Sequence, residues 1–359
     1  MKYLSYIGTY TNERKEGIHI FTSDAESGEI APVGLVGGIE NPTYLCLNRA
    51  GNRLYSTLGI TSLGDRKVNG ALAAYQVQGS KLKLLNFKPL NLTPPCYVAL
   101  DKREKSLIFA EYSNAVAGVF ELNADGSIAD DPPQRITHTG SGPNLKRQDK
   151  AHAHCAEMTP DNRYICIVDL GLDSVKLYDY ASRQSGLRAV PQMTLRTKGG
   201  AGPRHIIFHP NGNLAFVINE LDSTLGSYRY TDAGFEHIQT LSTLPADFSG
   251  SNTTAAVKIN AAGTQVFASN RGDDSIATFS VDALNGRLEL MAITRLTAPQ
   301  PRDFEFMPGE KFMLAGSQAG NSLQVYSYDK QTGGFQPVHQ PYTVHKPVCV
   351  KFGARIAYP

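Results

Sequence analysis

Short apolar runs separated by polar turns recur along the whole chain. Seven segments share one order: a small residue or proline, an apolar run, a polar turn, and a second apolar run. They begin at Pro42, Pro95, Ala153, Pro203, Thr253, Pro301 and Pro347. An internal period of about 50 residues, with several short strands in each unit, is typical of a β-propeller.

The turns and the alternation within each unit predict antiparallel strands. Residues 160–162 (Pro-Asp-Asn) and 210–212 (Pro-Asn-Gly) are turn-forming sequences between two apolar runs. Two further runs follow in each unit, for example residues 174–180 and 275–281, where side chains alternate with the period of two of a strand. We therefore expect an all-β, seven-bladed propeller with four antiparallel strands per blade, as a single domain over residues 1–359.

The two ends of the chain predict how the ring closes. The first unit starts with its second, third and fourth strands, at residues 3–10, 17–22 and 30–34, and the last unit supplies only a first strand, at residues 347–352. Pairing the C-terminal strand with the N-terminal three would complete a blade and cover two sheet edges that could otherwise aggregate. We expect deletion of residues 345–359 to destabilise the whole protein.

Composition argues against several classes of partner. Among 359 residues the formal net charge is only +2, and the densest basic stretch, residues 146–150, is short and interrupted, so we expect no nucleic-acid partner. No apolar run reaches the roughly 20 residues that cross a bilayer, and the N-terminus alternates like a strand rather than a signal peptide. Five scattered cysteines without a Cys-x-x-Cys pair fit buried thiols in a reducing compartment. We expect a cytoplasmic protein without a membrane partner.

Equivalent positions in the repeats predict where chemistry could occur. The start of the first strand and the end of the second lie at the same end of a blade, because these strands are antiparallel. The first set of positions is Thr43, Cys96, His154, Arg204, Thr254, Arg302 and Val348; the second is Tyr10, Leu58, Tyr112, Leu170, Glu220, Arg271 and Gln318. Five of these positions carry a histidine, arginine or glutamate, and all five fall in one arc of the channel mouth: His154, Arg204, Glu220, Arg271 and Arg302. Such a cluster favours a polar or anionic ligand.

The long polar loop before His154, residues 140–153, extends this candidate site. Lys146, Arg147 and His152 are candidates to hold an anionic group such as phosphate. His152 and His154 could both ligate a metal, but a third ligand is not evident, so we expect no metal and no other cofactor. His205 is expected to point to the other side of its strand from Arg204 and to be structural.

Four other positions have simple structural alternatives. Arg204 could cap backbone carbonyls, and Glu220 could be a salt-bridge partner alone. Tyr10 and Tyr112 are candidates to contact substrate or to close the channel by packing.

Several motifs resemble those of the seven-bladed propeller lactonases. They are Tyr6–Thr11 followed by Gly17-Ile18, the stretch GAGPRHIIFHP at residues 200–210, VINEL at 217–221, the loop from Gly142 to His154, Ser269–Arg271 and Gln300–Arg302. This family includes propeller-type 6-phosphogluconolactonases and carboxy-cis,cis-muconate lactonizing enzymes. The resemblance covers essentially the whole chain and implies the catalytic residues His154, Arg204, Glu220 and Arg271. The sequence Leu170-Gly171-Leu172 departs from the polar residue that relatives commonly carry there.

The resemblance implies hydrolysis of 6-phosphoglucono-δ-lactone, a step of pentose phosphate metabolism. Glu220 or His154 would be the base, Arg204 and Arg271 would stabilise the oxyanion, and the substrate's anionic group would be held by Lys146, Arg147 or Arg302. The alternatives are carboxy-muconate cyclisation by the same residues, or a protein-interaction propeller without catalysis. We expect a small anionic sugar-acid lactone as the ligand, and a monomer or weak homodimer.

Overall fold

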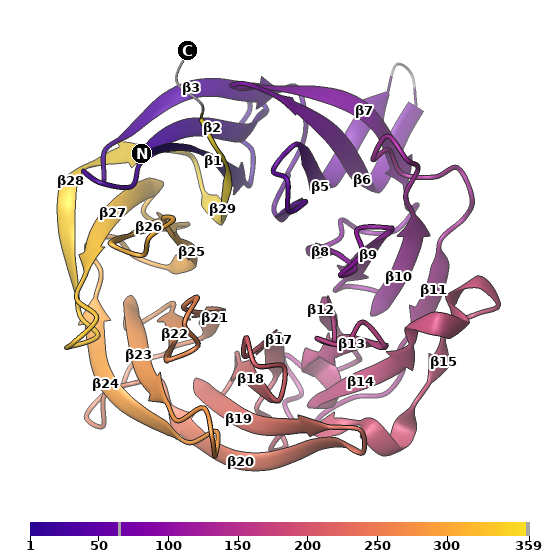
Figure 1. Ribbon diagram of the computed structural model, residues 1–359. Helices are drawn as coiled ribbons and strands as arrows, with labels where there is room; N and C mark the ends of the chain where they lie inside the picture. Colours follow the sequence, from indigo (N-terminus) through magenta and orange to yellow (C-terminus); the bar gives the residue numbers. More distant parts are fainter. Residues whose placement is uncertain (64–65, 357–359) are drawn as a thin grey trace.

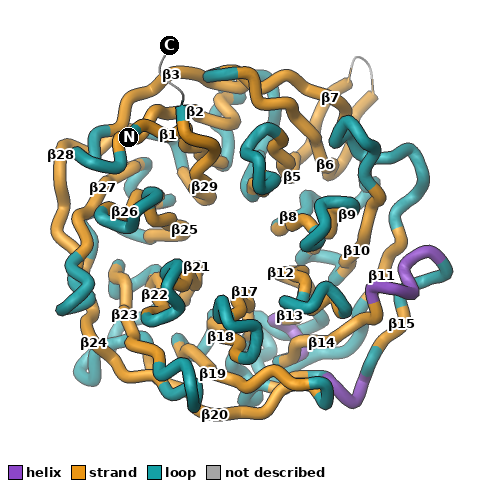
Figure 2. Tube along the Cα trace, in the orientation of Figure 1, coloured by secondary structure: helices purple, strands orange, loops and turns teal. Residues whose placement is uncertain are grey.

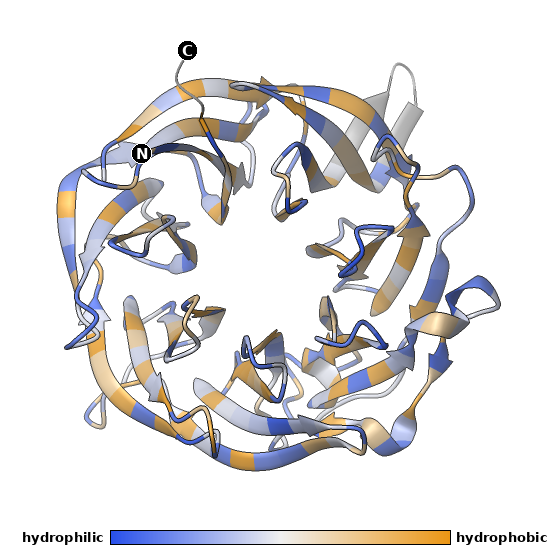
Figure 3. Ribbon diagram, viewed as in Figure 1, coloured by the Kyte–Doolittle hydropathy of each residue, from blue (hydrophilic) through white to orange (hydrophobic). Residues whose placement is uncertain are grey.

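Seven antiparallel β-sheets surround a central axis, each with one edge strand near the axis and one at the rim (Figure 1). The computed structural model describes residues 1–63 and 66–356. The predicted all-β, seven-bladed propeller is therefore confirmed. Apolar and polar residues alternate along several outer strands, as the sequence pattern predicted (Figure 3), whereas second strands such as residues 214–218 are continuously apolar.

The blades follow the order of the chain. Blade 1 combines both chain ends: β29 (Pro347–Arg355), β1 (Lys2–Thr9), β2 (Glu16–Asp24) and β3 (Ile30–Gly37). Blade 2 contains β4 (Leu45–Leu47), β5 (Arg53–Leu63), β6 (Arg66–Gln78) and β7 (Lys81–Pro89). Blade 3 contains β8 (Tyr97–Leu100), β9 (Ser106–Glu111), β10 (Val116–Glu121) and β11 (Gln134–Thr137).

The remaining blades have the same order from axis to rim. Blade 4 contains β12 (Ala153–Met158), β13 (Tyr164–Asp169), β14 (Ser174–Asp179), β15 (Arg188–Ala189) and β16 (Leu195–Arg196). Blade 5 contains β17 (Pro203–Phe208), β18 (Leu214–Asn219), β19 (Thr224–Thr231) and β20 (Gly234–Ser242). Blade 6 contains β21 (Thr254–Ile259), β22 (Gln265–Asn270), β23 (Ser275–Val281) and β24 (Leu288–Arg295). Blade 7 contains β25 (Pro301–Phe306), β26 (Phe312–Ser317), β27 (Ser322–Tyr328) and β28 (Phe335–Thr343).

The ring closes through blade 1, where the C-terminal strand pairs with the N-terminal one. β29 is antiparallel to β1, with a register that runs from Thr9 opposite Pro347 to Tyr3 opposite Arg355. In Figure 1 the yellow β29 lies on the axis side of the indigo β1. The predicted closure is confirmed, and neither of these two strands is left with an open edge along that register.

The outer edge of blade 4 is irregular. Two strands of two residues each, β15 and β16, pair with β14 in place of one continuous rim strand. The short 3-10 helices η2 (Tyr180–Gln184) and η3 (Pro191–Met193) occupy the intervening chain, and η1 (Leu170–Leu172) follows β13 (Figure 2). Pro191 has no N–H to donate to a ladder, which accounts for the break. The sequence pattern did not predict it. No helix in the described part of the chain is long and apolar enough to cross a membrane.

Apolar side chains fill the spaces between neighbouring blades. Phe216 on β18 and Phe279 on β23, for instance, are fully buried in one cluster between blades 5 and 6. All five cysteines are free thiols; Cys155, Cys166 and Cys349 are buried and the other two are half-buried. They behave as the small apolar residues that their strand-like surroundings predicted.

In blades 4 and 6, a polar side chain at the end of the second strand forms hydrogen bonds with neighbouring loops. Asp169 accepts hydrogen bonds from the His152 and Leu172 amides at 2.8 and 3.1 Å, and its other oxygen lies 2.6 Å from His138 Nδ1. Asn270 in blade 6 donates to the Thr243 carbonyl at 2.8 Å. These side chains hold the loops that lead to the axis, and the sequence analysis did not single them out.

Candidate functional site

Three of the predicted ring residues stand where the innermost ladder is interrupted. The pairing of the first and second strands skips one residue between Ala153 and Cys155, between Pro203 and His205, and between Pro301 and Asp303. The extra residues are His154, Arg204 and Arg302. A β-bulge re-aims its extra residue and is common beside functional sites. The bulges therefore place these side chains at the channel mouth.

Glu220 is the centre of the ionic cluster that results. It follows β18 directly, and its carboxylate meets guanidinium groups from three directions. Arg204 Nε and Arg271 Nη2 each lie 3.0 Å from Oε2, and Arg147 Nη2 lies 2.5 Å from Oε1. Arg204 also donates to the Ala255 carbonyl at 2.6 Å.

The neighbouring positive charges and burial have opposite effects on the pKa of Glu220. Its side chain is 6% exposed, and burial by itself would raise its pKa. Arg271, Arg204 and the Arg147 hydrogen bond outweigh burial and hold the pKa well below its ordinary value. Burial lowers the pKa of Arg271 to about 10, so its guanidinium stays charged at neutral pH. The cluster is therefore ionised throughout.

Two histidines, His154 and His205, lie beside this cluster. The position of His205 differs from the one expected from the sequence. His205 was expected to point away from Arg204, yet its Nε2 lies 3.1 Å from Arg204 Nη1. Its ring also stands edge-on to His154, with centroids 5.2 Å apart. The prediction is wrong because the bulge after Pro203 breaks the alternation on which it depended. Burial lowers the pKa of both histidines well below the usual value, so both rings are neutral.

Residues from the long loop and from blade 3 form one wall of the site. The ring of His152 stacks on Tyr112 with centroids 4.2 Å apart, and Tyr112 stands edge-on to His154 at 5.7 Å. His152 Nδ1 lies 3.1 Å from the Tyr112 carbonyl oxygen, and Nε2 lies 3.4 Å from Asp149 Oδ1. Within residues 1–63 and 66–356 no group of three or more metal-ligating side chains occurs. His152 contributes to this wall by stacking on Tyr112.

The opposite wall is formed by Arg302 and its neighbours. Arg302 donates to Gln318 Oε1 at 3.1 Å, and its guanidinium lies 5.7 Å from the centre of the Tyr10 ring, a cation–π contact. Lys146 lies elsewhere: it is exposed on the loop, where its amide donates to Asn144 Oδ1. The structure thus gathers every predicted site residue except Lys146 into direct contact with another member of the set.

The whole chain was compared with known proteins. It matches the family described as "Lactonase, 7-bladed beta-propeller" over residues 5–352. The chain belongs to the seven-bladed β-propeller lactonase family. A 6-phosphogluconolactonase of Bacillus subtilis (strain 168) is 35% identical over 355 residues, which cover 98% of each chain.

Two solved structures of related proteins have the same architecture. The periplasmic gluconolactonase of Pseudomonas aeruginosa has a TM-score of 0.91 at 28% identity and covers 99% of both chains. A putative 6-phosphogluconolactonase from Bacteroides fragilis has a TM-score of 0.88 at 29% identity, with 98% of both chains covered. The relatives support a lactonase. One of these similar structures is periplasmic by its description, so the cytoplasmic location stays a prediction.

A small cavity on the axis shows how tightly this candidate site is packed. Its volume is about 30 Å³, enough for one or two water molecules. Five of its lining residues are the first-strand positions that the sequence analysis aligned: Thr43, Cys96, Arg204, Arg302 and Val348. His205 and Tyr44 also line it. Tyr44 was missed because it follows the aligned position, Thr43, and was not itself one of the aligned positions.

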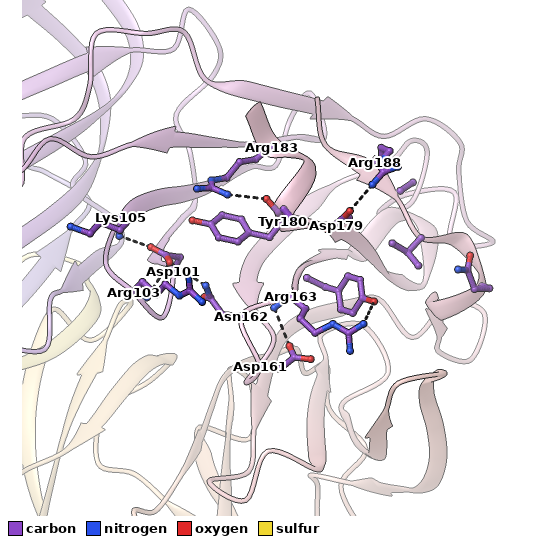
Figure 4. Close-up of a pocket in the computed structure, with 15 residues that line it drawn as sticks. Asp101, Arg103, Lys105, Asp161, Asn162, Arg163, Asp179, Tyr180, Arg183 and Arg188 are labelled. Atoms are coloured by element: carbon purple, nitrogen blue, oxygen red, sulfur yellow. Dashed lines mark hydrogen bonds and ion pairs between the residues drawn. The ribbon is translucent and has the colours of Figure 1, made fainter. Parts of the chain in front are cut away.

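A larger cavity, of about 660 Å³, lies away from this cluster (Figure 4). It is lined by the β8–β9 and β12–β13 turns and the rim of blade 4, at the strand ends opposite to the channel mouth. Its acidic residues serve the turns: Asp101 accepts from the Lys105 amide at 2.6 Å, and Asp179 pairs with Arg188 at 2.9 Å. Its lining contains none of the arginines that contact Glu220, nor Glu220 itself.

Proposed function

We propose that the protein hydrolyses the lactone of a sugar acid that carries an additional anionic group, with 6-phosphoglucono-δ-lactone as the first candidate. The excess of positive charge at the channel mouth carries this proposal. Arg147, Arg204 and Arg271 surround a single carboxylate, and Arg302 is close enough to lower the pKa of Arg204 further. Such a cluster favours a ligand with more than one negative charge. The name of the Bacillus subtilis relative supports the same substrate class.

Arg204 and Arg271 are the proposed stabilisers of the oxyanion. Both are fixed by backbone carbonyls as well as by Glu220: Arg204 by Ala255, and Arg271 by Thr254 at 2.7 Å. Arg271 Nε is buried and has no hydrogen-bond partner among the described residues. Donors held in place before the reaction stabilise developing charge without further reorganisation. Because arginines supply this positive charge, the proposed reaction needs no metal.

Glu220 is the proposed base. It would take a proton from water as the water oxygen bonds to the lactone carbonyl carbon. The ring C–O bond then breaks, and the same proton passes from Glu220 to the departing ring oxygen, so that the open acid forms. His154, neutral and edge-on to Tyr112, would line the sugar ring. An acyl carbon that is already reactive needs only a modest base.

Substitution of the two central residues tests this proposal. Proton release from fresh lactone would be followed in a weakly buffered indicator assay, with and without a chelator. We expect Arg204→Ala and Glu220→Gln each to lower kcat by about 10²- to 10³-fold. Arg103→Ala, an exposed arginine of the larger cavity, is the matched control and should keep full turnover. Full turnover in both central variants would overturn the assignment.

The same assay separates the other candidate functions. Turnover of carboxy-muconate in place of the phosphorylated lactone would favour the cyclase. A protein that is unaffected by phosphorylated and carboxylated ligands in a thermal-shift experiment would favour an interaction propeller, because a ligand that binds the native state raises Tm.

A further inference from the structure

The loop that carries Arg147 is fixed at its base. Gln148, the next residue, is fully buried: its Nε2 donates at 2.8 Å both to the Leu170 carbonyl and to Asp173 Oδ1, and its Oε1 accepts from the Asn144 amide at 3.0 Å. Residues 142 and 148 are joined again through the backbone, at 2.9 Å. The backbone at Arg147 is therefore held at one place over the channel mouth, and only its side chain is free to move.

Arg147 differs from the other two arginines that contact Glu220. Its side chain is 40% exposed, against 5% for Arg204 and 12% for Arg271. The inner two follow or belong to blade strands and share Oε2, whereas Arg147 alone contacts Oε1 among the described residues. A rotation of the Arg147 side chain would therefore expose Oε1 and leave the inner pairs intact.

We propose that Arg147 is the residue that selects an anionic substrate, by leaving Glu220 for the phosphate or carboxylate group and so exposing Oε1 to the reacting water. This inference rests on the proposed function. A guanidinium that exchanges one oxyanion for another keeps a charge-assisted interaction, and a phosphate or carboxylate group allows it two parallel hydrogen bonds where Glu220 accepts one. A neutral lactone offers no such exchange and must compete with the closed ion pair.

The exchange also changes the basicity of Glu220. The charged and titratable groups that face it are Arg147 from the loop, Arg204 from β17, Arg271 after β22, His154 from β12 and Tyr112 after β9. Arg147 is one of the groups that lower its pKa. Departure of Arg147 removes a positive charge and a hydrogen bond from Oε1, so the carboxylate becomes a better proton acceptor when the anionic substrate is bound.

The test compares two substrates in two loop variants. Arg147→Met removes the charge and keeps most of the side-chain length, and Lys150→Met removes a cation from an exposed position of the same loop. For Arg147→Met we expect kcat/KM for 6-phosphoglucono-δ-lactone to fall about tenfold or more. For unphosphorylated glucono-δ-lactone we expect kcat/KM to rise, because the ion pair with which this lactone must compete is gone. Lys150→Met should leave both values unchanged.

A pH profile distinguishes this role from a structural one. With glucono-δ-lactone, the acidic limb of kcat/KM in Arg147→Met should move to higher pH than in the wild type, because Glu220 has lost one of its cations. Arg147→Lys should restore part of the preference for the phosphorylated lactone. An equal fall for both lactones, or an unmoved acidic limb, would overturn the proposal while the lactonase function stands.

Binding of inorganic phosphate keeps the inference testable if the wild type hydrolyses neither lactone. In that case the proposed function fails. Phosphate should still raise the Tm of the wild type and of Lys150→Met, and raise it less in Arg147→Met. An equal rise in all three would remove Arg147 as the anion-binding residue.

Discussion

Glu220 is a buried carboxylate that the protein keeps ionised with charges from three separate parts of the chain. Arg147 comes from the loop before blade 4, Arg204 from the start of blade 5, and Arg271 from the end of the second strand of blade 6. A buried charge is tolerated only when it is paired, and removing one partner leaves the others uncompensated. In the proposed mechanism, the chemistry and the stability of this region would depend on the same residue.

Glu220→Gln should destabilise the protein in a way that depends on pH. At pH 7 we expect the free energy of unfolding to fall by about 3 kcal/mol, since three guanidinium groups lose their counter-ion. The folded-state pKa of Glu220 lies below its ordinary value of 4.5, so its contribution is present above that pH and is lost as pH falls. The difference in the free energy of unfolding between the wild type and Glu220→Gln should shrink by about 1.4 kcal/mol per pH unit below 4.5.

Urea unfolding at pH 7, 4.5 and 3.5 would measure this difference. Glu236→Gln, at an exposed position of β20, is the control and should stay within about 0.5 kcal/mol of the wild type at every pH. A difference for Glu220→Gln that does not change with pH would contradict the ionised state assigned to it.

At the scale of elements, short irregular segments place the site residues that regular strands alone would not. One-residue bulges in the innermost strands turn His154, Arg204 and Arg302 toward the axis. The helix η1 supports the loop of Arg147: Gly171 lies so close to the Lys150 carbonyl that a Cβ atom there would overlap it. Gly171, which precedes the Leu172 that departs from the lactonase pattern, is thus the close contact that supports this loop.

Gly171→Ala should displace this loop. A methyl group would push against the Lys150 carbonyl and the His152 amide, and we expect a loss of about 1–3 kcal/mol in stability together with weaker selection for the phosphorylated lactone. Gly199→Ala is the control, because its Cβ would meet its nearest neighbour, Pro143 Cγ, at an ordinary 3.6 Å. Thermal unfolding and the ratio of kcat/KM for the two lactones measure both effects. A Gly171→Ala protein with wild-type stability and selectivity would contradict the support role.

At the scale of the whole molecule, blade 1 holds the ring together. β29 brings the end of the chain to β1, and Asp303 Oδ2 in blade 7 accepts from the Val350 amide at 2.8 Å. Asp303 also lies 3.4 Å from Lys258 in blade 6. The closing strand is therefore bonded to its own blade and to the preceding one.

Deletion of residues 345–359 should lower the Tm of the entire propeller by about ten degrees or more, on a scale of about 2–4 °C per kcal/mol for domains of about 150–250 residues. The lost strand exposes the β1 edge and the apolar clusters on both sides of blade 1. Calorimetry measures the effect, and a peptide of residues 345–356 added in trans should restore part of it. A truncated chain with unchanged Tm would show that blade 1 does not hold the ring.

Local patterns in the sequence were sufficient for the architecture. Turn-forming residues and alternation define seven units, the split of one unit between the chain ends predicts the closure, and aligned positions place His154, Arg204, Glu220 and Arg271 at one end of the blades. These signals are short in range, because a strand's alternation and a turn's backbone preference depend on neighbouring residues. The irregular rim of blade 4 lacked such a signal.

Only the tertiary structure decided what those side chains contact. Alternation failed for His205, because a bulge forms between two paired strands and not within one. The three ion pairs of Glu220 join residues that are 16 to 73 positions apart, and nothing in the local sequence records which of several arginines reaches it. The packing of the blades around the axis decides which arginines reach Glu220, because a buried carboxylate must be paired with positive charge.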